Sequence, residues 1–232
     1  MPVNLLTKAI ILRRTNYGEA DRILTLLTPE HGQQTVMARS VRKEKSKLAG
    51  GIELFAICEL GLAKSSGNSS GMWTLTSSRI IRFYDQVMTD YDRLQFGYEG
   101  IKQLARLSDV VESPLLYTTL EQLFGLLDNL KVDLRLSRIW FYLHLANLKG
   151  GELNLLTDSN GMKLVEGASY EYNVGDKVLV YSERGGRFTT EVIKLLRILN
   201  KGNSDIIYRL SPIKDDVINE ALYLARVAVD SC

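Results

Sequence analysis

The chain has 232 residues, of which 45% are hydrophobic and 24% charged, which suggests one large domain or two smaller ones and excludes intrinsic disorder. Its two cysteines, Cys58 and Cys232, exclude a disulfide framework and a cysteine-based zinc site, so a reducing cytoplasm fits best. No window approaches about 18 consecutive apolar residues, and the N-terminal residues do not resemble a signal peptide, so we expect neither export nor a membrane span.

Charge is distributed unevenly along the chain. The formal net charge is +2, but residues 1–82 hold 12 Lys and Arg against 6 Asp and Glu, whereas residues 83–232 hold 17 against 21. A basic surface raises the local concentration of phosphate-bearing partners, so the N-terminal part is expected to meet a polyanion. Solvated charge without a partner is the alternative interpretation.

The first 82 residues contain short apolar runs separated by turn residues, a pattern typical of an all-β barrel or sandwich. Alternation in the fourth run places every second residue from Ile52 to Leu60 on one face, which predicts a half-buried strand. The Ser- and Gly-rich residues 64–71 are predicted to form a flexible hairpin tip. An OB barrel has about this size, and an SH3-like barrel would give a similar pattern. The five predicted strands are 9–12, 22–28, 33–39, 52–62 and 73–81.

From about residue 84 the period changes, because apolar residues recur every three or four positions, which predicts helices. A small strand-rich insert is predicted at about 150–188. Ser211 and Pro212 are expected to cap and begin the last helix. The predicted helices begin near 84, at 114 and at about 133, and resume at 189–199 and 212–229. The fold class is therefore α+β: a five-stranded OB-type β-barrel over 1–82, then an all-α helical bundle with the insert over 83–232.

The strongest local feature lies between the third and fourth predicted strands, where residues 39–47 hold five cations and one anion. Flexible cations at this spacing repel one another unless something negative lies between them. A phosphate backbone would supply that charge, and affinity should then fall steeply with salt. A solvated loop is the alternative. The five cations are Arg39, Arg42, Lys43, Lys45 and Lys47.

The loop after the first predicted strand supplies further candidates, because in an OB barrel it lies near the nucleic-acid face. Three arginines border it: Arg13, Arg14 and Arg22. Base stacking requires an exposed π face, and the aromatic candidates are Tyr17, Phe55 and Trp73. Core packing is the alternative for each of them, and is favoured for Trp73.

Two acidic residues near the same loop, Glu19 and Asp21, are interpreted as groups that order it by pairing with neighbouring arginines. Catalytic patterns are few. His31 and His144 have no metal ligand at a suitable spacing, so both are interpreted as structural. The segment from Ser40 to Lys43 matches S-x-x-K, but its partner motifs are absent, so an acylating enzyme is disfavoured. We predict no enzyme, cofactor or metal.

The segments Ala-Ile-Ile-Leu-Arg-Arg at 9–14, Tyr-Gly-Glu-Ala-Asp-Arg at 17–22 and Ala-Arg at 38–39 with its basic continuation resemble the N-terminal domain of the bacterial RecO recombination mediators. Weaker similarity extends through Gly-Arg-Phe-Thr at 186–189. The resemblance implies an OB domain joined to a helical domain. It also implies binding to single- and double-stranded DNA, strand annealing, and cooperation with a RecR-like mediator and the single-stranded DNA-binding protein to load recombinase.

The chain departs from that family at the insert. The helical domain of the family is often interrupted by a four-cysteine zinc finger, whereas residues 150–188 contain no cysteine, so we expect short strands to stabilise the insert instead. The sequence predicts a non-enzymatic, cytoplasmic DNA-binding mediator of DNA repair and recombination, without a membrane partner. The alternative is an OB-fold protein-interaction scaffold without annealing activity.

Overall fold

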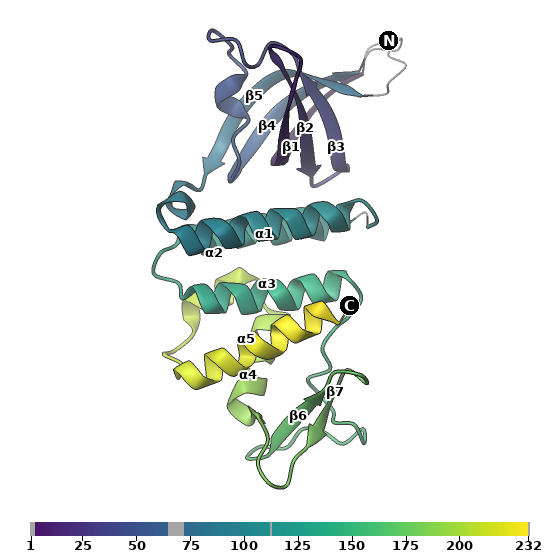
Figure 1. Ribbon diagram of the computed structural model, residues 1–232, viewed down its shortest axis with the longest axis vertical. Helices are drawn as coiled ribbons and strands as arrows, with labels where there is room; N and C mark the ends of the chain where they lie inside the picture. Colours follow the sequence, from purple (N-terminus) through teal and green to yellow (C-terminus); the bar gives the residue numbers. More distant parts are fainter. Residues whose placement is uncertain (1–2, 65–71, 112, 232) are drawn as a thin grey trace. The chain divides into compact units, whose positions relative to one another are not determined.

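The computed structural model describes residues 3–64, 72–111 and 113–231 (Figure 1). They form two compact units, Met1–Asp128 and Asn129–Cys232. The first unit contains all five strands of a barrel and two helices, and the second contains three helices and a small sheet. The hairpin tip predicted at 64–71 lies, apart from Lys64, outside the described residues.

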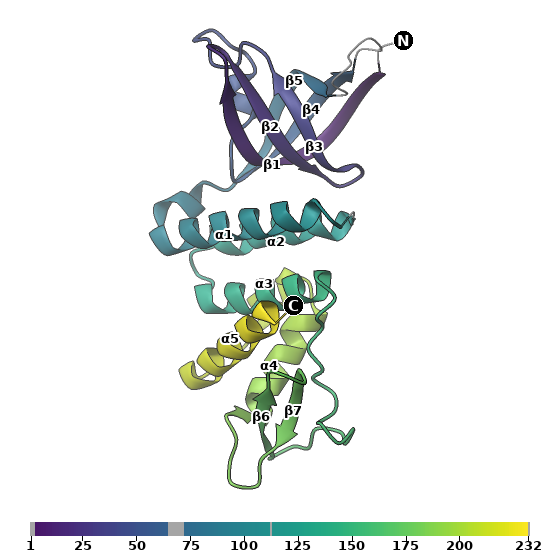
Figure 2. The ribbon, with the colours of Figure 1, turned by 45° about the vertical axis from the view of Figure 1, so that its right-hand side comes forward.

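A five-stranded barrel forms the N-terminal part of the chain, which confirms the predicted fold class (Figures 1 and 2). The strands follow the order β1-β2-β3-β5-β4, and β4 pairs again with β1. All pairs are antiparallel except β3 with β5. The strands are β1 (Val3–Tyr17), β2 (Asp21–Thr28), β3 (Gly32–Ala38), β4 (Ala56–Lys64) and β5 (Trp73–Phe83).

The apolar run at 9–12 is buried on both faces of β1. Ala9 and Ile11 belong to the interior cluster of the barrel, whereas Ile10 and Leu12 are buried outside that cluster. Helices α1 (Tyr91–Ser108) and α2 (Pro114–Asp128) contact the outer surface of the first three strands. The unit therefore has two apolar layers, one inside the barrel and one between the barrel and the helices.

Two predicted strands have the wrong boundaries. β1 extends far beyond 9–12, because the residues on either side of this run also pair, residues 3–10 with β4 and residues 10–17 with β2. β4 begins at Ala56 instead of Ile52, because a 3₁₀ turn at Ala49–Gly51 and a positive φ of 55° at Phe55 interrupt the extended backbone. The fourth strand is also more than half-buried, since Ile57 on its outer face is 3% exposed.

Phe55 packs against both helices of the first unit. Its buried ring lies 5.1 Å from that of Tyr98 on α1 and 5.2 Å from that of Phe124 on α2, between ring centroids. A Cβ added at Gly97 would lie 2.5 Å from Cε1 of Phe55, so only glycine allows α1 to approach this closely. The N-terminus of α1 is capped by Asp90, whose side chain accepts a hydrogen bond from the Arg93 amide.

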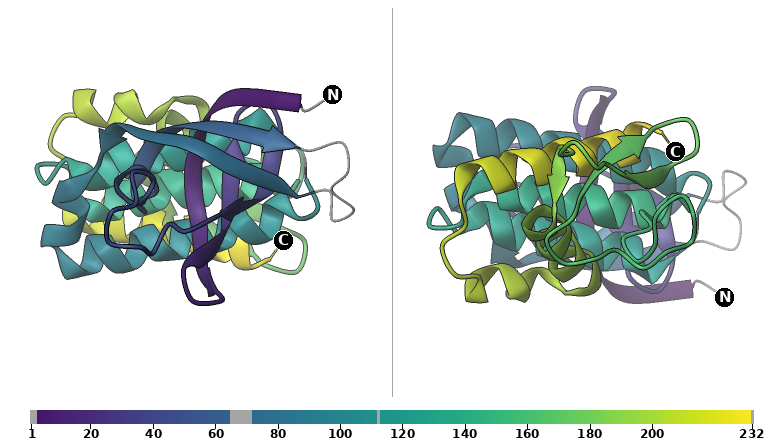
Figure 3. Two further views of the ribbon diagram at one scale, coloured as in Figure 1. Left: turned by 90° about the horizontal axis from the view of Figure 1, so that it is seen from above. Right: turned by 90° about the horizontal axis from the view of Figure 1, so that it is seen from below.

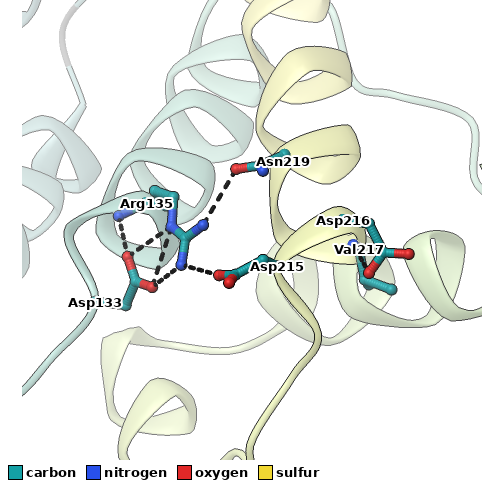
Figure 4. Close-up of polar contacts among 6 residues, drawn as sticks. All are labelled: Asp133, Arg135, Asp215, Asp216, Val217 and Asn219. Carbon is teal, nitrogen blue, oxygen red and sulfur yellow. Dashed lines mark hydrogen bonds and ion pairs between the residues drawn. The ribbon is translucent and has the colours of Figure 1, made fainter.

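The second unit packs α3 (Leu134–Leu148), α4 (Thr190–Lys201) and α5 (Asp215–Asp230) together. Arg135 links the first turns of α3 and α5 (Figure 4). Its guanidinium donates to Asp133 and to Asp215, each at 2.6 Å, and to Asn219 at 3.2 Å. These carboxylates raise the pKa of Arg135, so it stays charged.

The start of the last helix differs from the prediction. Lys214 is the N-cap of α5 and makes no side-chain capping bond, so Ser211 and Pro212 lie outside the helix. Asp215 and Asp216 occupy the first turn instead, where the positive end of the helix dipole stabilises their negative charge.

The predicted strand-rich insert is present as a three-stranded sheet of order β7-β6-β8. Its two longer strands, β6 and β7, are labelled in Figure 1. Three buried side chains, Tyr170, Leu179 and Phe188, form its apolar centre. Arg187 attaches the insert to α5, because its guanidinium lies 3.6 Å from the Tyr223 ring centroid and pairs with Glu220. Its strands are β6 (Ser169–Asn173), β7 (Val178–Tyr181) and β8 (Phe188–Thr189).

Candidate nucleic-acid interface

Residues 39–47, here called the rim loop, lie beside the tip of the β1–β2 hairpin at one end of the barrel (Figure 3, left). The pairs Tyr17–Asp21 and Arg22–Ala38 bring the ends of the first three strands to this place. The Ser40 amide donates to Oδ1 of Asp21 at 2.6 Å, and the Arg42 amide donates to the Ala20 carbonyl at 2.9 Å. The rim loop is therefore fixed to the hairpin tip by hydrogen bonds.

A single apolar side chain fastens the rim loop to the barrel. Val41 is 2% exposed and belongs to the interior cluster, whereas all five cations of the loop are exposed. Within the described residues no carboxylate forms an ion pair with any of these five, and the Arg42 guanidinium donates only to the Gly18 carbonyl, at 3.1 Å. The loop therefore displays a row of unneutralised positive charge.

The three arginines near the hairpin have different surroundings. Nη1 of Arg14 donates to Glu53 at 2.8 Å and to the Ile52 carbonyl at 3.2 Å, so this half-buried side chain braces the segment before β4. Arg22 donates to Oδ1 of Asn16 at 3.2 Å. Arg13 is exposed and forms no side-chain hydrogen bond or ion pair with the described residues. Arg13 is thus the most available of the three for a ligand.

Arg13 belongs to a continuous surface, which we call the outward β1–β3 face. Residues directly opposite each other in a sheet point to the same side, and the register pairs Arg13 with Thr25 and Thr25 with Thr35. Their neighbours Leu24, Leu26 and Val36 point into the barrel. The face consists of Arg13, Thr15, Tyr17, Asp21, Ile23, Thr25, Thr35 and Met37, and its one acidic side chain, Asp21, accepts the hydrogen bond from the Ser40 amide.

The three aromatic candidates for base stacking differ in their exposure to solvent. Tyr17 is 55% exposed at the rim end of the outward β1–β3 face. Phe55 is 1% exposed, so the prediction that it could stack on a base is wrong. Trp73 packs against the barrel interior and donates from Nε1 to Gln34 at 3.2 Å, which agrees with the preference for core packing.

The predicted pairing of Glu19 and Asp21 with neighbouring arginines is wrong: among the described residues neither forms an ion pair, and Asp21 accepts instead from the Ser40 amide of the rim loop. Of the two histidines, His31 lies exposed in a turn, whereas the ring of His144 stacks on Trp140 at 4.2 Å between centroids. Burial lowers the pKa of His144, so its ring is neutral at neutral pH. In the part of the chain that the structure describes, no group of three or more His, Cys, Asp and Glu side chains could hold a metal ion.

Sequence reasoning missed two cations on α1. Lys102 and Arg106 line a groove together with Arg13, at the boundary between the outward β1–β3 face and α1. Half-exposed Tyr98 lines the same groove. The spacing 98, 102 and 106 places these side chains on one face of a helix, and this signal was available in the sequence.

The fold and the rim loop define the class of the protein: an OB-fold domain with a cation-rich rim, followed by helices and a small sheet. The family model described as "Recombination protein O N terminal" matches residues 1–84.

Similarity to curated proteins extends over most of the chain. The DNA repair protein RecO of Dehalococcoides mccartyi is 31% identical over 230 residues, which cover 94% of this chain and 87% of that protein. The RecO protein of Syntrophomonas wolfei is 23% identical over 224 residues, covering 89% of this chain and 88% of its own. That of Roseiflexus is 41% identical over 101 residues, 44% of this chain and 34% of its own. The chain belongs to the RecO family of DNA repair and recombination proteins.

A zinc finger of the kind implied by the family resemblance does not fit the insert. Its residues include no cysteine, and the described part of the chain holds no alternative cluster of metal ligands. Packing of Tyr170, Leu179 and Phe188 stabilises this sheet, with Arg187 attaching it to α5. No helix among the described residues is long and apolar enough to cross a membrane.

Proposed function

We propose that the chain is a non-enzymatic mediator of DNA repair and recombination that binds single- and double-stranded DNA through the rim loop and the outward β1–β3 face. The single observation that supports this most strongly is the row of five exposed cations in the rim loop, which have no carboxylate partner among the described residues. Such a row is stabilised when phosphates lie between the charges. Family membership adds independent support.

The same geometry gives a physical route to strand annealing. Two DNA strands repel each other through their phosphates, and a protein that neutralises phosphates on both lowers this repulsion. Arg13 and Tyr17 would engage one strand along the outward β1–β3 face, and the rim-loop cations, including Lys43, would pair with phosphates of that strand and of the second one. Base stacking on exposed Tyr17 is tolerant of sequence, as a general mediator requires.

We further propose that the chain works in the cytoplasm with a RecR-like mediator and the single-stranded DNA-binding protein to load recombinase. The family resemblance supports these partners, and the helices of the second unit offer exposed apolar side chains such as Tyr208 and Ile198. Binding and annealing need no covalent step, so no residue is assigned a catalytic role.

Neutralising the rim loop tests the proposal. Replacing Arg42, Lys43, Lys45 and Lys47 together by Gln should weaken binding to a single-stranded oligonucleotide and slow annealing of complementary strands. Up to four phosphate contacts are lost, so the slope of log K against log salt should fall by up to about 3, because each single-strand contact contributes about 0.7. Fluorescence anisotropy over a salt series measures this, and thermal unfolding should change little because these side chains are exposed.

Unchanged affinity and an unchanged salt slope would contradict the assignment of the rim loop. If the variant also kept its binding to the single-stranded DNA-binding protein, the interpretation as a protein-interaction scaffold would be favoured instead.

A further inference from the structure

A second cationic site lies on the barrel side of α1. Arg13 of β1 and Lys102 and Arg106 of α1 line one groove, together with Tyr98. None of the three cations forms a side-chain hydrogen bond or ion pair with the described residues. Mutual repulsion of three such charges disfavours the unliganded groove, so an anion with several spaced charges would be stabilised there.

The lining of the groove includes part of a polar network. Nε2 of Gln33 donates to Oδ1 of Asp109 at 2.7 Å, and the Ser108 hydroxyl donates to Oε1 of Gln33 at 2.7 Å. Asp109 is the one acidic side chain of the lining, and this bond to β3 holds it at the C-terminal end of α1. The groove adjoins the outward β1–β3 face, since Arg13 and Thr25 belong to both.

Tyr98 is positioned by packing. Its ring lies edge-on to buried Phe55 at an interplanar angle of 74°, yet the residue remains 48% exposed. An exposed aromatic ring beside cations is the combination that single-stranded nucleic acids use, because bases stack while phosphates pair with charge.

We propose that α1 supplies a second wall of the DNA site: Lys102 and Arg106 bind phosphates of the same single strand that follows the outward β1–β3 face from the rim loop, and Tyr98 contacts a base. The proposal rests on the proposed function and extends it to a helix outside the barrel. Charge complementarity identifies the occupant, since a single strand presents both regularly spaced phosphates and unpaired bases.

The test compares two double variants of equal charge change. Lys102→Gln with Arg106→Gln removes the groove cations, and Lys163→Gln with Lys201→Gln removes two exposed lysines of the second unit. Anisotropy with a single-stranded oligonucleotide over a salt series should show a slope lowered by about 1.4 for the groove variant, from two contacts of about 0.7 each, and an unchanged slope for the control.

Three further measurements exclude an indirect effect. Arg106 lies in the last turn of α1, where a cation also stabilises the helix, so thermal unfolding is recorded for each variant. Lys102→Arg with Arg106→Lys keeps both charges and should keep the wild-type slope. In a series of oligonucleotides of increasing length, the groove variant should lose the gain in affinity that longer strands give the wild type.

The outcomes separate the two proposals. If the rim variant lowers the slope and the groove variant does not, the second wall is wrong and the proposed function stands. If neither variant lowers it, the proposed function is wrong, and the groove proposal with it. A lowered slope in the lysine control equal to that of the groove variant would mean that net charge alone governs binding, which would also overturn the second wall.

Discussion

Burial in the barrel interior changes the pKa of one titratable residue, Cys58. Burial raises the pKa of its thiol from 9.0 to about 11. Between these values the unfolded chain loses the proton while the folded chain keeps it, so this group contributes stability that is lost as pH rises from about 9 to 11.

We predict that a Cys58→Ala variant loses less unfolding free energy between pH 9 and 11 than the wild type does. The alanine has no proton to lose, and its small cavity lowers stability equally at all pH values. Urea denaturation at several alkaline pH values measures the two slopes. Equal slopes would show that the thiol does not titrate differently in the two states.

Two glycines test how closely the helices of the first unit approach the barrel. Gly97→Ala should destabilise the chain by about 1–3 kcal/mol, because the new Cβ would lie 2.5 Å from the rigid Phe55 ring. Gly125→Ala on α2 is the matched control, since its Cβ would meet nothing within 4 Å and should stabilise by about 0.5–1 kcal/mol. Denaturant midpoints measure both. Stabilisation by Gly97→Ala would contradict the packing described here.

Sequence patterns predicted the presence and type of each element more accurately than the residues at which it begins and ends. Period-2 and period-3.6 apolar spacing located the strands and helices because burial depends on that spacing. The β4 start was missed because the positive φ of Phe55 depends on tertiary contacts with α1 and α2 that no local pattern reports. The α5 start was missed because Ser211 and Pro212 satisfy the local rules for a cap, although the chain turns into helix only after Lys214.

The candidate site could be predicted from the sequence only in part. The cation run of the rim loop was evident because charge density is a local property of the sequence. The sequence did not show which arginines can bind a ligand, because Arg14 forms an ion pair with Glu53, which lies 39 positions further along the chain. The groove that Arg13 and Lys102 line could not be predicted either, because it depends on how α1 packs against β1.

At the scale of the whole molecule, the excess of positive charge in residues 1–82 coincides with the barrel, and the net negative remainder belongs to the helices and the insert. A polyanion is therefore expected to select the barrel over the second unit, even though net charge over the chain is only +2. The other proposals rest on binding of DNA by the rim loop and the outward β1–β3 face.

Hydrogen exchange of the full chain, measured by mass spectrometry with and without a single-stranded oligonucleotide, locates the bound DNA on the chain. We predict slower exchange on binding at residues 13–22 and 35–47, with 98–106 added if α1 forms the second wall, and unchanged exchange across Asn129–Cys232. Protection confined to Asn129–Cys232, with the barrel unaffected by bound DNA, would contradict binding by the rim loop and the outward β1–β3 face.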